Sequence, residues 1–429
     1  MITRHPFLRT TLLILAAIAP PVVSAQSAGE HWVTTWTTAN RPAPAAAAFI
    51  VGQPTTATQQ AQLGFNNQTV RMIVPVSLGG GRIRVHFSNT FGSAPLVIGT
   101  AHVGLHAKDS AITPGSDRAL TFSGRPGFTV PPGAMAISDP VDLTVPALGE
   151  LAVSVFVPGV TAPPTFHALA LHTTYISKQG DATTQASFTD PATTQASYWI
   201  SSVDVMAPAD AAAIIAFGDS ITDGARSTPE TDSSWPSRLA RRLAGNRDTA
   251  HLAILNQGIA GNRVLRDTVG PNALARFDAD VLAHPGVKWL IVLEGINDIG
   301  RGTGPNANPA DAVTTEELIA AHRQMIERAH LRGIKVMGAT LTPFMGAAYY
   351  SERGEGIRTS VNNWIKTSGA YDAVIDFDAA TRDANHPLQF RPEFDSGDHL
   401  HPTDAGYKAM ADAFDLAVFS AKTVSASAK

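Results

Sequence analysis

The sequence contains no cysteine among its 429 residues. This absence excludes disulfide bonds, thiolate metal sites and a cysteine nucleophile. Charged residues make up only 16% of the chain, the formal net charge is −4, and no basic cluster is present. The chain is therefore a poor candidate for binding nucleic acid. Hydrophobic residues make up 44%, which fits a globular protein with a large core and argues against a disordered chain.

Long hydrophobic runs are also absent, but the N-terminus has the pattern of a signal peptide over residues 1–25. Arg4 and Arg9 give a positive start, residues 12–19 form a short apolar core, and residues 23–25 are small enough for cleavage. That core is shorter than the ~20 residues needed to span a bilayer. We therefore expect a secreted or periplasmic protein with no stable membrane insertion after signal cleavage. Cleavage removes two arginines and no acids, which changes the net charge from −4 to −6.

Residues 30–207 have the patterns of β-structure. In GRIRVHFSN, the apolar residues Ile83, Val85 and Phe87 alternate with basic residues, which is the period of a half-buried strand. The preceding segment VRMIVPVSL and the three glycines at 79–81 predict that these two strands form a hairpin. Proline and glycine recur at short intervals between the apolar segments. This spacing favours an all-β sandwich or jelly-roll accessory domain.

After about residue 208 the apolar pattern changes. Continuous apolar runs of strand length, typical of strands buried on both faces, alternate with helical stretches. The clearest helix is predicted over 315–332, where Thr314 and Glu317 have capping-box spacing. This alternation predicts a three-layer α/β domain with a parallel sheet over residues 208–420. The predicted strands are 212–217, 252–258, 287–295, 334–343 and 373–377.

Polar motifs follow these strands, at the sheet edge where functional groups collect. GDSITDG places Ser220 after the first strand, GNR places Gly261 after the second, and GIND places Asn297 after the third. The segment DSGDHLHPTDAGY carries Asp398 and His401 before the last predicted helix. Hydrolysis of an ester by a serine needs a base, a group that orients the base, and donors for the oxyanion. The four motifs together contain all of these groups.

Several positions have competing interpretations. His399 competes with His401 as the base, and Asp395 competes with Asp398 as the orienting acid. The Asp-x-x-His spacing favours the pair Asp398 and His401. Arg263, beside the glycine of the GNR motif, is predicted to contact substrate, with a solvent-exposed side chain as the alternative.

The histidines of the β-region are scattered without metal-ligand spacing, so we expect no metal site there or elsewhere. The tryptophans of this region, Trp32, Trp36 and Trp199, are more typical of core residues than of a platform for stacking sugars.

The four motifs, in this order, resemble those of the SGNH (GDSL-type) hydrolase family. The resemblance covers residues 212–418 and implies the SGNH hydrolase fold, a flavodoxin-like three-layer parallel sheet. The G-x-S-x-G motif of ordinary α/β-hydrolases is absent. The upstream half resembles the β-domain of secreted bacterial GDSL esterases, through WVTTWTTA, RVHFSNTFG and YWISSVDV.

The resemblance implies a serine esterase that uses no cofactor. Ser220 is the expected nucleophile, His401 the base and Asp398 the third member of the triad, and the expected oxyanion donors are Ser220, Gly261 and Asn297. The implied substrates are small-molecule or polysaccharide esters, above all short-acyl (acetyl) esters of carbohydrates. The alternatives are a lysophospholipase or arylesterase, and a catalytically silent carbohydrate-binding protein. The oligomeric state is left open.

Overall fold

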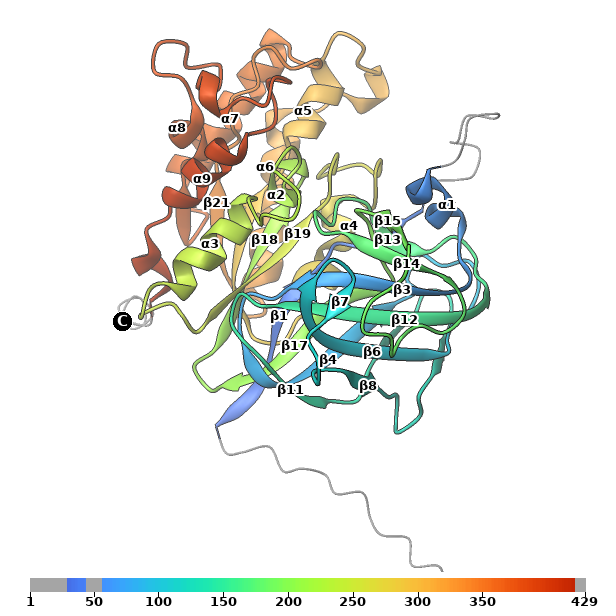
Figure 1. The fold of residues 1–429 in the computed structure, drawn as a ribbon. Coiled ribbons are helices and arrows are strands. Elements are labelled where there is room, and N and C mark those ends of the chain that lie inside the picture. Colours follow the sequence, from blue (N-terminus) through green and yellow to red (C-terminus); the bar gives the residue numbers. More distant parts are fainter. Residues whose placement is uncertain (1–28, 44–55, 421–429) are drawn as a thin grey trace, which may run out of the picture.

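The structure is a computed structural model, and it describes residues 29–43 and 56–420 (Figure 1). Antiparallel strands fill the first half of this range, and a parallel sheet with helices fills the second half. The predicted signal peptide at 1–25 lies outside the described residues. Within the described ranges, every helix is too short or too polar to cross a membrane.

One antiparallel sheet has five strands in the order β1-β17-β4-β10, with β11 also pairing with β4. Strand β4 has the predicted alternation, because Ile83, Val85 and Phe87 are fully buried and the basic residues between them are partly exposed. The strands of this sheet are β1 (Glu30–Thr37), β4 (Gly80–Ser88), β10 (Met135–Ile137), β11 (Val141–Val145) and β17 (Ile200–Pro208).

A second antiparallel sheet has seven strands in the order β15-β14-β3-β12-β6-β7, with β8 also pairing with β6. Both antiparallel sheets contribute buried side chains to one core, as expected for a β-domain. The strands of the second sheet are β3 (Asn66–Pro75), β6 (Thr100–Lys108), β7 (Ala111–Ile112), β8 (Arg118–Leu120), β12 (Glu150–Val160), β14 (Thr174–Gln179) and β15 (Ala192–Thr194). Smaller pairings join β2 (Arg41–Pro42), β13 (Thr165–His167) and β16 (Ser197–Tyr198), and β5 (Leu96–Ile98) with β9 (Phe128–Val130).

The predicted hairpin between β3 and β4 is wrong, because the two strands belong to different sheets. Both edges of β3 are occupied, one by β12 and the other by β14. The link after Pro75 crosses from one sheet to the other, and its backbone N–H groups bond to distant carbonyls. Val76 donates to Gly149 at 2.8 Å, and Ser77 donates to Thr35 at 3.1 Å.

The second half is built on five parallel strands in the order β19-β18-β20-β21-β22. Numbered along the chain, this order is 2-1-3-4-5, which belongs to doubly wound sheets. Every residue of the interior strand β18 is buried, as its continuous apolar run predicts. The strands are β18 (Ala212–Gly218), β19 (Leu252–Gly258), β20 (Val287–Leu293), β21 (Lys335–Ala339) and β22 (Ala373–Ile375).

Helices cover both faces of the parallel sheet (Figure 1). Helix α3 packs with α9, whereas α6 packs with α4 and α7. Helix α6 begins with the predicted capping box, in which the side chains of Thr314 and Glu317 each accept a backbone N–H of the other residue. The helices are α1 (Ala57–Leu63), α2 (Ser220–Asp223), α3 (Trp235–Ala244), α4 (Ala273–Phe277), α5 (Ile296–Thr303), α6 (Thr315–His330), α7 (Glu352–Thr367), α8 (Phe377–Thr381) and α9 (Asp404–Asp412).

The two halves meet along β19, which is an edge strand of the parallel sheet and lies against β1. The buried hydroxyl of Ser77 accepts the Ile254 N–H at 3.0 Å, and its one hydrogen lies between the carbonyls of Thr35 at 2.8 Å and Ile254 at 3.1 Å. Thr37 Oγ1 donates to the Asn256 carbonyl at 3.1 Å. An exposed strand edge is a template for unwanted pairing. The β-half therefore supplies partners that this edge would otherwise lack.

Replacing Ser77 by alanine should destabilise the protein, because the buried N–H and carbonyl of Ile254 would both lose their partner. We expect the free energy of unfolding to fall by about 1–3 kcal/mol, as measured by urea denaturation. Ser360→Ala is the matched control, since Ser360 is exposed and its hydroxyl donates to the Gly356 carbonyl within one helix. Equal stability of the two variants would contradict the assignment of Ser77 to the edge.

Candidate active site

Three side chains from distant parts of the sequence form one chain of hydrogen bonds. Ser220 is the first residue of α2, directly after β18, and its Oγ lies 2.8 Å from His401 Nε2. His401 Nδ1 lies 2.8 Å from Asp398 Oδ2. The acid and the imidazole both lie on the loop that precedes α9. In this arrangement the imidazole can accept the serine proton while the carboxylate holds its other nitrogen.

The environment of Asp398 favours its ionised form. Its Oδ1 accepts the backbone N–H groups of Leu400 at 3.1 Å and His401 at 2.9 Å. Arg226 Nε also donates to Oδ2, at 3.2 Å. Partial burial alone would raise the pKa of Asp398, but the hydrogen bonds from the His401 side chain and backbone outweigh burial and hold this pKa well below its ordinary value.

The competing pair in the same loop bonds internally. Asp395 Oδ2 contacts His399 Nδ1, and Asp395 Oδ1 accepts the backbone N–H groups of Gly397 and His399. His399 has a left-handed backbone with φ of 60°, and half of its side chain is exposed. Asp395 thus bonds to His399, whereas Ser220 and Asp398 both bond to His401.

The loop that carries Gly261 is tied to the end of β18, because the Ile259 N–H donates to the Gly218 carbonyl at 3.0 Å. Gly261 has a left-handed backbone with φ of +81°, and a Cβ there would lie 2.8 Å from the side chain of Val269. A side chain at this position is therefore excluded by both conformation and space.

Asn297 lies in the first turn of α5 and is buried. Its Nδ2 donates to the Asn262 carbonyl at 2.9 Å, and its Oδ1 accepts the Tyr349 hydroxyl at 3.3 Å. An amide nitrogen carries two N–H donors, so one remains beyond the bond to Asn262. The described contacts of Asn297 thus hold its amide next to the Gly261 loop.

Arg276 joins the ends of three strands, a role that no sequence motif indicated. Its guanidinium donates to the carbonyls of Gly218 at 2.9 Å and Gln257 at 2.8 Å, and to Asn262 Oδ1 at 2.9 Å. It also pairs with Asp280 at 2.8 Å and with Glu294 at 3.3 Å. The side chain is buried and stacks over Phe217, with its Cζ 4.0 Å from the ring centroid. A helical arginine has no local signal that distinguishes this role from a surface position.

Buried acids lie near Arg276 and Arg263 at the strand ends and support the loops. Asp219 caps α2 by accepting the Ile221 N–H, and Asp298 accepts the N–H groups of Val264 at 2.7 Å and Leu265 at 3.1 Å. Complete burial raises the pKa of Asp219 to about 7 and also raises that of Asp298. Burial and the nearby Asp219 raise the pKa of Glu294 well above its ordinary value.

Arg263 is buried, with only 1% of its side chain exposed. Its Nη1 lies 3.0 Å from Asp311, and its Nε lies 3.9 Å from Asp298. In this conformation the guanidinium pairs with protein carboxylates and is not at the surface. The predicted contact of Arg263 with substrate stays a prediction, and its observed partners are structural.

The fold and these contacts define a class: an α/β protein with a hydrogen-bonded Ser-His-Asp group at the carboxyl edge of a parallel sheet. Residues 216–409 match the GDSL-like Lipase/Acylhydrolase family. This match covers less than half of the chain, and the members of that family are esterases and lipases. A search of curated proteins found no match.

Solved structures also resemble the chain over about half of its length. An acetylxylan esterase from Geobacillus stearothermophilus is 22% identical, covers 48% of this chain and 93% of its own, and has a TM-score of 0.38. A GDSL-like lipase from Bacteroides thetaiotaomicron is 19% identical, with coverages of 48% and 87% and a TM-score of 0.36. An α/β hydrolase from the metagenome of Lake Arreo, Spain, is 21% identical, with coverages of 48% and 95% and a TM-score of 0.38.

Replacing Arg276 by methionine should destabilise the protein, because the buried acids and strand-end carbonyls would lose a shared partner. Removing one member of a buried ion pair costs about 3–5 kcal/mol, and we expect a loss of that size in urea denaturation. The control is Arg323→Met, since Arg323 is exposed on α6 and stacks over Trp364. Similar midpoints for both variants would show that Arg276 does not hold the strand ends together.

Proposed function

We propose that this protein is a serine esterase in which Ser220 is the nucleophile, His401 the general base and Asp398 the group that orients His401. The observation that carries the proposal is the pair of 2.8 Å contacts that connect Ser220 Oγ, His401 and Asp398. A serine hydroxyl is a weak nucleophile until an adjacent base takes its proton. The contact between Ser220 Oγ and His401 Nε2 lies within the range in which such a transfer is possible, and the contact with Asp398 orients the imidazole.

The reaction then proceeds in two steps. Ser220 Oγ attacks the ester carbonyl as His401 Nε2 takes its proton, and the same proton passes to the departing alcohol to leave an acyl-enzyme. Water, deprotonated by His401, hydrolyses the acyl group and restores the serine. Asp398 stays ionised and stabilises the imidazolium that forms in each step. No cofactor takes part in this scheme.

The proposed oxyanion donors are the backbone N–H groups of Ser220 and Gly261 and the side-chain amide of Asn297. Ser220 is the first residue of α2, where backbone N–H groups have no partner within the helix. The second N–H of the Asn297 amide is available once the first has bonded to Asn262. Such donors act on the charge that develops in the transition state, and removing one typically costs about 100- to 1000-fold in kcat.

The proposed substrates are carboxylic esters with short acyl groups, in particular acetyl esters of carbohydrates. The motifs around Ser220, Gly261, Asn297 and His401 support this class through their resemblance to SGNH esterases. We further propose that the enzyme is secreted or periplasmic, because residues 1–25 have the pattern of a signal peptide.

Replacing Ser220 by alanine should remove the activity, because no other hydroxyl contacts His401 among the described residues. We expect the hydrolysis of p-nitrophenyl acetate to fall at least ~1000-fold, in line with the loss of a triad nucleophile. Ser360→Ala on the surface of α7 is the control and should retain full activity. Equal rates for wild type and Ser220→Ala would refute the proposal, and faster turnover of the decanoate ester would instead favour a lipid substrate.

The two aspartates of the His401 loop offer a matched test of the orienting role. Asp398→Asn should lower kcat about 10⁴-fold, because an amide favours the wrong imidazole tautomer. Asp395→Asn should change kcat less than ~10-fold, since Asp395 bonds to His399 and not to His401. Steady-state kinetics on the acetate ester would measure both effects. A larger loss in Asp395→Asn would assign the orienting role to the other acid.

A further inference from the structure

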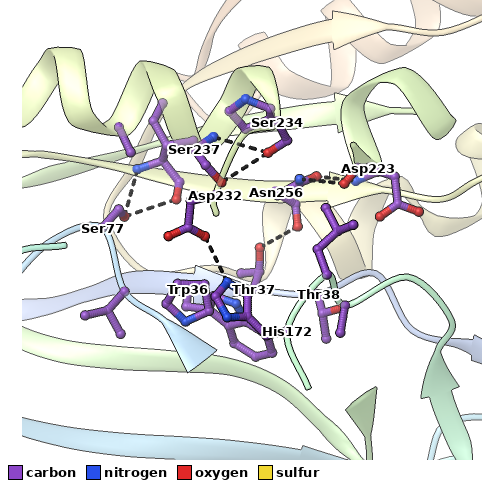
Figure 2. Close-up of a pocket in the computed structure, with 18 of the residues that line it drawn as sticks. Trp36, Thr37, Thr38, Ser77, His172, Asp223, Asp232, Ser234, Ser237 and Asn256 are labelled. Carbon is purple, nitrogen blue, oxygen red and sulfur yellow. Dashed lines mark hydrogen bonds and ion pairs between the residues drawn. The ribbon is translucent and has the colours of Figure 1, made fainter. Parts of the chain in front are cut away.

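Acidic and histidine side chains gather where the β-half meets the loop between α2 and α3. His172 precedes β14, and Asp232 precedes α3; both line a cavity of about 160 Å³ at this boundary. Figure 2 shows Asp232 pointing at His172 from the opposite side of the cavity. Glu150, the first residue of β12, and Glu230, from the same loop as Asp232, contact the other edge of the imidazole. None of these groups takes part in the proposed ester chemistry.

The two nitrogens of His172 have different surroundings. Nε2 lies 2.9 Å from Asp232 Oδ1 in a well-formed hydrogen bond. Nδ1 is buried and has no hydrogen-bond partner within the described residues, although the side chain is only 4% exposed. This atom faces Glu230 Oε2 at 3.4 Å and Glu150 Oε1 at 3.9 Å. A buried nitrogen in this position is placed either to pair with the two carboxylates as part of an imidazolium or to bind a cation together with them.

The hydrogen bond to Asp232 has a specific consequence for this nitrogen. Metal-binding histidines usually donate their other ring N–H to a carboxylate, which fixes the tautomer and orients the lone pair. If Nε2 carries the proton and donates to Asp232, Nδ1 carries the lone pair and points between Glu150 and Glu230. One donor atom each of Glu150, His172 and Asp232 lies within 4.8 Å of the others, and Glu230, outside this group, lies 3.4 Å from His172 Nδ1.

Each of the two glutamates is also held in place by a partner of its own. Glu150 Oε2 contacts His106 Nδ1, which leaves Oε1 facing His172. Thr173 Oγ1 donates to Glu230 Oε1 at 2.6 Å, which leaves Oε2 facing His172. All three potential ligands therefore have a second contact that orients them, as in established metal sites.

We propose that His172 Nδ1, Glu150 Oε1 and Glu230 Oε2 bind a divalent metal ion, and that Zn²⁺ is the best fit. Ligand atoms of a tetrahedral Zn²⁺ site lie about 3.4 Å apart, given metal–ligand distances near 2.1 Å. The distance from His172 Nδ1 to Glu230 Oε2, 3.4 Å, meets this value. The distance from His172 Nδ1 to Glu150 Oε1, 3.9 Å, needs only a small side-chain shift.

Charge and access favour the same assignment. The two carboxylates balance the two charges of the ion, and a ligand set with imidazole nitrogen favours Zn²⁺ over Ca²⁺ or Mg²⁺. The side chains of Glu150 and Glu230 are 35% and 48% exposed, so the ion can enter and water can complete the coordination. Because Glu150 and His172 belong to the β-half and Glu230 to the catalytic half, the ion would join the two.

The sequence predicted no metal site, because the histidines of the β-region lack ligand spacing. The proposed ligands lie at positions 150, 172 and 230, and only the fold brings them together. A metal-free explanation competes with the proposal. Burial alone would lower the pKa of His172, but Asp232 and Glu230 raise it to about 9. Without metal the ring would then be an imidazolium that simply pairs with these acids.

Calorimetric titration of the full chain with Zn²⁺ separates these two explanations. The protein should carry no polyhistidine tag, should be treated with a chelator, and should be measured at pH 8. We expect about one Zn²⁺ per chain and a melting temperature that rises on addition of Zn²⁺. Ca²⁺ and Mg²⁺ should bind at least ~100-fold more weakly. No saturable Zn²⁺ binding would overturn the proposal, and preferred binding of Ca²⁺ would overturn the assignment of His172 as a ligand.

Three variants locate the ion. His172→Asn and Glu230→Gln should each weaken Zn²⁺ binding at least ~100-fold, and Asp232→Ala should weaken it about 10- to 100-fold through loss of the orienting bond. Glu230 lies on a partly exposed loop, so its variant is expected to fold even if His172→Asn does not. His386→Asn is the control, since this side chain is 71% exposed. Undiminished Zn²⁺ binding by folded Glu230→Gln would refute the site. Ester hydrolysis is measured separately, because it tests the proposed esterase and not the metal site.

Discussion

The position of the candidate catalytic serine depends on how the buried ends of β18, β19 and β20 are held together. Carbonyl groups and acids at these ends lie out of contact with water, where polar groups without partners are costly. Arg276 bonds to the carbonyl of Gly218, the last residue of β18, and to that of Gln257, the residue before the end of β19. It also pairs with Glu294, which directly follows β20. Ser220 lies two residues beyond Gly218. The position of Ser220 therefore depends on Arg276, a buried cation that contacts neither His401 nor Asp398.

The β-half is also part of the framework of the site. Its Ser77 and Thr37 bond to the edge strand β19, and the largest core cluster contains side chains from both halves. His167, from β13, lies 3.0 Å from Asp223, and both side chains are buried. Asp223 is the last residue of α2, the short helix that begins with Ser220. Through His167 the β-half therefore directly contacts the short helix that begins with Ser220.

Local patterns predicted the elements well, whereas long-range pairings and buried charges could not be read from them. The capping box of α6 and the alternation in β4 depend on residues a few positions apart, so the sequence contains them fully. The hairpin prediction failed because β12 and β14 occupy both edges of β3, and no local signal records this competition. The motifs identified Ser220, His401 and Asp398, which the fold brings into contact. Arg276, Glu150 and Glu230 belong to no motif, because their partners are distant.

Two acids near the serine have opposite environments, which explains why one suits the triad and the other does not. Asp398 is partly exposed and receives hydrogen bonds from an imidazole, an arginine and backbone N–H groups, all of which favour its charge. Asp219, next to Ser220, is fully buried, and one of its oxygens has no hydrogen-bond partner among the described residues. Burial and the nearby Asp298 favour its neutral form. Asp398 also contacts His401 Nδ1 at 2.8 Å, whereas Asp219 bonds to the Ile221 N–H and caps the helix that begins with Ser220, so Asp398 is the acid placed to orient His401.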